Sequence, residues 1–201
     1  MAVARHSHGP PPSGITAPMA SQLPDHLKAE QAAVEADIRA AFHGVGRGHG
    51  VSWSESEAID NYSSLPDRAK ARSKDTERRW EELVDDPNWN PGPGIGGFSF
   101  LDPIGYRYYI APAMIRVVRA GSDQWGIDFA LTVNDEFWAH RIGLFKPAQG
   151  AAIARFLRFM ISVDQAARDE FAASYGGVGS DIKWTCGWRR ALESHWDRFE
   201  P

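Results

Sequence analysis

The stretch from Phe98 to Val118, FSFLDPIGYRYYIAPAMIRVV, constrains the fold of this chain more than any other. Aromatic and aliphatic residues in its first half alternate with other side chains at the two-residue period of a strand. Between two such runs, Asp102, Pro103 and Gly105 suit a type I turn, because Pro presets φ and Gly accepts a left-handed exit. The stretch therefore predicts a β-hairpin, and Pro112 then ends the second strand and begins a short helix.

Helices are predicted on both sides of this hairpin. Apolar residues recur at helical spacing over 25–42, and again from Pro147 to about Val163 with a continuation to Tyr175. A short helix through Tyr62 and a long charged helix over 67–84 are expected between them, and 127–132 alternates as a third strand. The fold class that follows is α+β: a small antiparallel sheet built on the central hairpin and packed by several helices.

Three regions differ in composition. Residues 1–22 are rich in Pro, Ser, Ala and His, which predicts a disordered tail and leaves open whether Met1 or Met19 is the natural start. Residues 23–175 form a single α+β domain, and 176–201 form a C-terminal aromatic helical extension after a glycine-rich break. Three tryptophans of this extension, at 184, 188 and 196, recur at helical spacing, so the extension docks on the domain or enters a groove on a partner. Docking is favoured, because exposed tryptophans invite aggregation.

The motif LDxxGxRxYxxPA, which runs from Leu101 to Ala113, resembles the centre of an uncharacterised bacterial family of unknown function. A downstream Leu-Thr pair and the Pro-x-Gln helix start at Pro147 extend the resemblance over roughly Leu27 to Ser162. The resemblance implies a helical N-terminal half joined to the hairpin. It implies no activity, because the family has no established one.

Overall charge and composition narrow the function classes. The net charge of −4 and pI near 6.0 argue against a chain built for nucleic acid, despite a locally basic stretch over 68–79. No apolar run approaches the roughly 20 residues that span a bilayer, which argues against a membrane protein. The single cysteine fits a reducing cytosol, so a cytoplasmic location is expected.

A polar row on the predicted helix over 67–84 is the first candidate site. Arg72, Asp75 and Arg79 lie about one turn apart there, with Trp80 at the edge, and such a row binds an anion or is simply a solvated helix face. The family resemblance also makes Arg72, Asp75 and Trp80 recurring landmarks, which is a reason to name them without assigning catalysis.

A second polar cluster, Asp102, Arg107 and Tyr109, belongs to the predicted hairpin. Arg107 is expected to reach Asp102 and pin the turn, and recognition of a ligand is the alternative. The sequence has no nucleophile elbow, Walker loop, paired Cys-x-x-Cys or zinc-protease helix, so no catalytic residue, metal site or cofactor is predicted.

Two function classes remain open. The first is a non-enzymatic module that binds another protein, in the manner of immunity proteins or adaptors; the acidic balance and eight tryptophans favour it. The second is a small enzyme that acts on an anionic small molecule through Arg72, Asp75 and Arg107. Convergence of those side chains in a deep pocket would favour the enzyme. The sequence does not indicate an oligomeric state.

Overall fold

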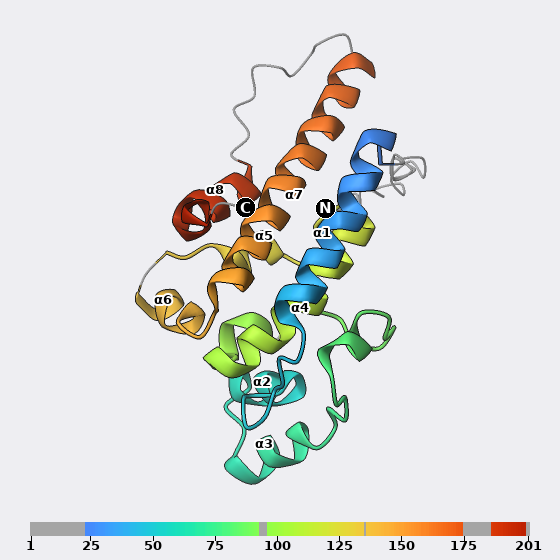
Figure 1. Cartoon of the computed structure of the whole chain (residues 1–201). Coiled ribbons are helices and arrows are strands. Elements are labelled where there is room, and N and C mark those ends of the chain that lie inside the picture. The colour runs from blue at the N-terminus through green and yellow to red at the C-terminus, as the bar shows by residue number, and fades with distance from the viewer. Residues whose placement is uncertain (1–22, 93–95, 135, 175–185, 200–201) are drawn as a thin grey trace, which may run out of the picture.

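A computed structural model describes residues 23–92, 96–134, 136–174 and 186–199 (Figure 1). All regular secondary structure in these ranges is helical, and no strand occurs among them. The predicted α+β fold with an antiparallel sheet is therefore wrong. The α-helices cover Asp25–Phe42 (α1), Trp53–Asp60 (α2), Leu65–Arg72 (α3), Pro103–Ala120 (α4), Ile127–Leu131 (α5), Glu136–Ile142 (α6), Pro147–Ser174 (α7) and Gly187–His195 (α8). Short 3-10 helices cover Trp80–Leu83 (η1), Gly97–Phe100 (η2) and Trp196–Arg198 (η3).

The predicted hairpin is the beginning of α4. Asp102 is the N-cap of this helix, and its Oδ1 accepts a hydrogen bond from the Gly105 amide at 2.8 Å. Pro103 occupies the first helical turn, where its missing N–H costs nothing. The same Asp-Pro-x-Gly chemistry thus suits a turn or a helix start, and the side chains that follow decide between them.

α4 is buried on nearly every side, which explains why its sequence indicates a strand and a turn. Nearly every side chain from Gly105 to Val118 is buried, so the helix shows no contrast between a wet and a dry face. Pro112 lies inside this helix and not at an element boundary. A helix surrounded by protein tolerates that interior proline, although the proline removes one backbone hydrogen bond.

Three long helices form the main body of the molecule. α1 packs against both α4 and α7, and Figure 1 shows α1 and α7 side by side. The predicted helix over 25–42 is confirmed with the same bounds, and four residues of its apolar stripe are buried: Leu27, Val34, Ile38 and Phe42. Their burial places the hydrophobic core between these helices.

The predicted long helix over 67–84 is interrupted. α3 ends at Arg72, and the chain is not helical again until η1. Hydrogen bonds of Asp75 to residues outside the predicted helix explain the break. Its carboxylate accepts from the amide and the hydroxyl of Ser54, and its carbonyl accepts from Arg47. α2 and α3 pack on each other at the end of the bundle where α4 begins (Figure 1).

The segment 127–132 is helix α5 and not the predicted third strand. The carboxylate of Asp123 accepts hydrogen bonds from the amides of Trp125 and Asp128, which turns the chain into α5. An apolar run this short does not distinguish strand from helix by its period.

The helix predicted from Pro147 is confirmed, and it continues without interruption through Ser174 as α7. Its start lacks a Ser or Thr cap, but the Gln149 side chain accepts a hydrogen bond from the Lys146 amide at 3.0 Å. No helix in the described ranges is long and apolar enough to cross a membrane.

The C-terminal helix α8 docks on the body, as favoured from the sequence. Trp188 is buried with its ring centroid 5.5 Å from that of Phe156 on α7. Trp196 is also buried, and its Nε1 donates to the carbonyl of Leu131 at 2.8 Å. The predicted tail over 1–22, the glycine-rich break over 176–180 and Trp184 lie outside the described residues.

Candidate functional site

The loop before α2 is fixed by the motif at the start of α4. Asp102 Oδ1 accepts a second hydrogen bond, from the Val51 amide at 2.9 Å. A Cβ on Gly105 would lie far closer to the Val51 carbonyl than the 3.0 Å that real Cβ contacts keep. The aspartate and the glycine therefore hold the loop directly against α4.

Tyr109, also from the motif, connects this loop to the segment after α3. Its hydroxyl accepts from Arg47 Nη1 and from the Trp53 amide, each at 3.0 Å, and donates to Glu77 Oε1 at 2.8 Å. Burial, together with the nearby carboxylate of Glu77, raises the pKa of Tyr109 above its usual range. The phenol thus stays protonated and serves as a structural hub.

Arg47 is held between two carboxylates. Its Nη1 lies 3.3 Å from Glu77 Oε1 and 3.8 Å from Asp75 Oδ2, and its Nη2 donates to the Asp75 carbonyl at 3.0 Å. Burial opposes its charge, but the Tyr109 hydroxyl and the two carboxylates outweigh that cost and raise the pKa of Arg47. The guanidinium joins the loop before α2 to the chain after α3.

A hollow opens beside this network, between the start of α2 and the segment over 74–90, with a volume of about 430 Å³. Among its described lining residues, Lys74 is the only basic one. Five carboxylates line it, from Glu57, Asp75, Glu77, Glu82 and Asp86. We call this site the acidic hollow.

Two tryptophans form the apolar part of its wall. The rings of Trp53 and Trp89 meet edge to face with centroids 5.4 Å apart. Trp89 is only 6% exposed, and its Nε1 has no acceptor among the described residues. The Arg116 guanidinium lies 5.0 Å from the centroid of the Trp89 ring, and the centroid of the Tyr109 ring lies 6.1 Å from it. The tryptophans therefore form a buried apolar wall and leave one buried donor unsatisfied.

The metal-binding potential of these carboxylates is low. No group of three His, Cys, Asp or Glu side chains in the described ranges is arranged to hold a metal ion.

The site residues predicted from the sequence do not converge. Arg72 donates to Glu55 Oε2 at 2.7 Å and to the Gly50 carbonyl at 2.8 Å, so it braces the loop before α2. Of the predicted residues, only Asp75 lines the acidic hollow. Trp80 is buried, with its Nε1 bonded to the Phe42 carbonyl at 3.0 Å.

The two remaining predicted arginines lie elsewhere. Arg79 is largely exposed, with its Nε 3.8 Å from Glu82 Oε1. Arg107 donates to the Leu144 carbonyl at 2.9 Å and does not pair with Asp102, so the predicted pin across a turn is wrong. With α3 ending at Arg72, the polar row has no continuous helix to carry it.

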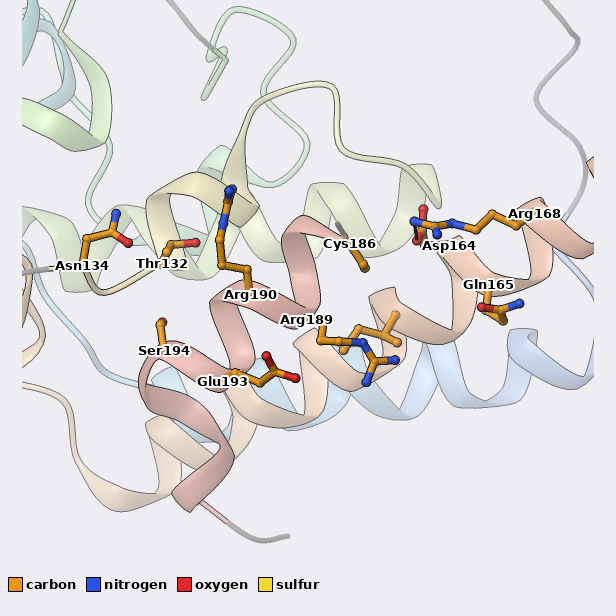
Figure 2. Close-up of a pocket in the computed structure, with 11 residues that line it drawn as sticks. Thr132, Asn134, Asp164, Gln165, Arg168, Cys186, Arg189, Arg190, Glu193 and Ser194 are labelled. Carbon is orange, nitrogen blue, oxygen red and sulfur yellow. Dashed lines mark ion pairs between the residues drawn. The ribbon is translucent and has the colours of Figure 1, made fainter. Parts of the chain in front are cut away.

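A second hollow, of about 490 Å³, lies between α7 and α8 (Figure 2). Figure 2 shows Arg189 and Arg190 extending from α8 in different directions. Arg168 pairs with Asp164 at 2.7 Å. Burial and the Asp164 carboxylate raise the pKa of the Cys186 thiol, which keeps it protonated. Mixed charges and divergent side chains favour no ligand class here.

One protein-family model matches most of the chain. A model described as a family of unknown function, DUF6714, matches residues 30–199. The chain belongs to this family. The DUF6714 match runs beyond Ser162 and includes α8, so the estimate that the C-terminal segment lies outside the family resemblance was wrong. No curated protein and no solved structure matches the chain.

Sequence reasoning missed most of the hollow. Arg47 sits in a glycine-rich loop that looks like a plain connector, and Trp89 follows a helix-ending Asp-Pro pair. The available signal was composition: acidic residues and three tryptophans gather in 53–89, in a chain of ordinary overall charge content. That signal indicates a cluster without showing which members meet.

Proposed function

We propose that this chain is a non-enzymatic binding module that recognises another protein by taking a basic side chain of that partner into the acidic hollow. One observation carries the proposal: five carboxylates and a single lysine line a hollow whose remaining wall includes two tryptophans. An excess of one charge beside apolar walls attracts the opposite charge more strongly than the same charges in open water.

An uncommitted carboxylate at the hollow supports a basic ligand. Glu57 is exposed, and its carboxylate has no hydrogen-bond or ion-pair partner among the described residues. A basic side chain brings the donors that this carboxylate can accept.

The alternative, a small enzyme acting on an anion through Arg72, Asp75 and Arg107, has less support. Arg72 donates to backbone carbonyls and to Glu55, Arg107 donates to the Leu144 carbonyl, and neither lines the acidic hollow. Asp75 faces a hollow of its own sign, which would repel an anionic substrate.

Binding can be tested with fluorescein-labelled peptides of glycine and serine that carry either three basic or three glutamate residues. Fluorescence anisotropy with the full chain should show binding of the basic peptide alone. The double variant Glu57→Gln/Glu82→Gln should weaken it about tenfold, which corresponds to about 1.4 kcal/mol.

Glu170→Gln is the matched control, because Glu170 is an exposed carboxylate near the end of α7. It changes net charge as each substitution in the hollow does, and it should leave the affinity unchanged. Equal weakening by the control would mean that only overall charge matters and would refute a site at the hollow, as would absence of binding by the basic peptide.

A further inference from the structure

We infer that two copies of this chain form a weak symmetric dimer through the outer surface of α3 and the turn before it. We call this surface the α3 face and define it by Tyr62, Leu65, Asp67, Ala69 and Lys70. None of these residues lines the acidic hollow, so the inference goes beyond the proposed function.

α3 buries very little of its own surface in the fold. Among its 8 residues only Ala71 is buried, whereas the apolar residues Leu65, Pro66 and Ala69 are exposed. The helix packs on α2 at one end of the molecule (Figure 1). A helix this short normally owes its stability to an apolar face packed against protein. An apolar face on the solvent side is expected where a second molecule covers it.

The turn between α2 and α3 adds a tyrosine whose ring the fold leaves in solvent. Tyr62 is 93% exposed and Leu65 is 78% exposed. Tyr62 has φ of 54°, its amide bonds the Ile59 carbonyl, and the next amide bonds the Ala58 carbonyl. These bonds end α2 in the motif whose left-handed position glycine normally occupies. A tyrosine there costs stability without burying its ring, as expected of a residue that contacts another molecule.

The charges beside this apolar surface are complementary to themselves. Asp67 and Lys70 are both exposed on one edge of α3, three positions apart. A two-fold axis across the middle of α3 reverses the helix direction and keeps this edge against the same edge of the second copy. Asp67 of each copy then faces Lys70 of the other. Among the described residues the Lys70 ammonium has no ion-pair partner, and Asp67 uses one carboxylate oxygen to accept from Ser64.

A second copy therefore fits the α3 face without any further surface. Ala69 lies near the two-fold axis, where a small side chain allows two helices to approach closely. Leu65 of one copy then lies beside Ala69 of the other, and Tyr62 extends the apolar contact at each end. One short helix and one turn from each copy make a small interface, so a dissociation constant of about 10 to 100 µM is expected.

Sedimentation equilibrium of the full chain tests the inference. Between about 1 µM and about 500 µM the weight-average mass should rise from 22.3 kDa toward twice that value. Tyr62→Ser/Leu65→Ser changes two exposed residues, so the fold should survive while association weakens at least about tenfold. Leu144→Ser/Phe171→Ser is the matched control, because it also removes a leucine and an aromatic residue that are exposed. It should leave association unchanged.

A charge exchange tests the two-fold pairing itself. Asp67→Lys and Lys70→Asp each place like charges opposite one another, so each variant alone should associate about tenfold more weakly. Mixed in equal amounts, the two variants should form a heterodimer in which both pairs are restored, with an affinity close to that of the parent chain. Lys146→Asp changes an exposed lysine outside the α3 face and should have no effect. Circular dichroism checks that each variant keeps its helices.

Several results would overturn the inference. One is a parent chain that stays at 22.3 kDa at about 500 µM. Others are association that survives Tyr62→Ser/Leu65→Ser and charge variants that do not complement each other. A monomeric chain that cosediments with phosphatidylglycerol vesicles through Tyr62 and Leu65 would assign the face to a membrane and would also overturn it. None of these results involves the binding of basic peptides, so the proposed function is tested separately.

Discussion

Replacing Arg116 by methionine removes the group that holds one wall of the acidic hollow. Arg116 projects from α4, and its guanidinium donates to the carbonyls of Leu83 at 2.7 Å, Val84 at 3.1 Å and Trp89 at 2.5 Å, and also to that of Asp86. These carbonyls belong to η1 and the irregular chain after it, which have few other backbone partners. Methionine keeps the aliphatic stem and lacks every donor.

The cost follows from the carbonyls left behind. Leu83, Val84 and Trp89 are buried, so water cannot readily replace the guanidinium at their carbonyls, whereas Asp86 is partly exposed. At about 1 to 1.5 kcal/mol for each of three buried acceptors, the free energy of unfolding should fall by about 3 to 5 kcal/mol. Arg116→Lys retains three donors at one point and should recover only part of this loss.

Urea unfolding followed by tryptophan fluorescence measures the change, and hydrogen exchange locates it. Amides over 83–90 should exchange faster in Arg116→Met than those of α1, because the loss is local. Arg119→Met is the control from the same helix: Arg119 makes surface ion pairs with Glu35 and Asp85, so its removal should cost about 1 kcal/mol or less. A loss below about 1 kcal/mol for Arg116→Met, with unchanged exchange over 83–90, would refute the reasoning.

Three further substitutions have defined outcomes. Gly105→Ala should lower the free energy of unfolding by about 2 to 4 kcal/mol, because its Cβ would collide with the backbone carbonyl of Val51, which has no room to yield. Tyr62 is 93% exposed with φ of 54°, so Tyr62→Asn should stabilise the chain by about 0.5 to 1 kcal/mol, since asparagine tolerates this left-handed conformation better. Burial and the neighbouring carboxylate of Asp123 raise the pKa of Asp128 above its ordinary value of 3.8. Protonated Asp128 therefore stabilises the fold below that pH, and this stabilisation is lost as the pH rises through the folded-state pKa. Asp128→Asn should accordingly gain stability relative to the parent chain between pH 4 and pH 7.

Each of these outcomes has a matched control in urea titrations. Gly46→Ala introduces the same Cβ in open space and should change stability little. Asn61→Ala, next to the strained tyrosine, should not stabilise. Asp169→Asn, on the exposed side of α7, should leave stability little changed. A stabilised Gly105→Ala, a destabilised Tyr62→Asn or a pH-independent difference for Asp128→Asn would contradict the corresponding argument.

The sequence predicts helices well where one face of the helix meets water. α1 and α7 alternate between buried and exposed side chains, and both were located from that period. α4 has no such contrast, so the alternation of its aromatic residues indicated strands. Its N-cap at Asp102 has the same residue chemistry as a turn and was therefore predicted as one. The segment after Arg72 failed for another reason: contacts of Asp75 with Ser54, distant in sequence, override a local helical preference.

The candidate site was less predictable because its parts are far apart in the chain. Arg47, Tyr109 and Glu77 meet only after the loop before α2 has folded against α4. The sequence singled out Arg72 on a predicted helix and Arg107 in a predicted hairpin, and both bond backbone carbonyls. Arginines that brace loops and arginines that bind ligands have the same sequence signature, and only the partners distinguish them.

Both walls of the acidic hollow depend on one helix. Tyr109 fixes the wall formed by Trp53 and Glu77, and Arg116 fixes the wall formed by the chain over 83–89. These two residues of α4 are seven positions apart, about two helical turns, and therefore lie on the same face. Irregular segments on their own would let the carboxylates drift relative to one another. Attachment of both walls to a largely buried helix therefore fixes the positions of the carboxylates relative to one another.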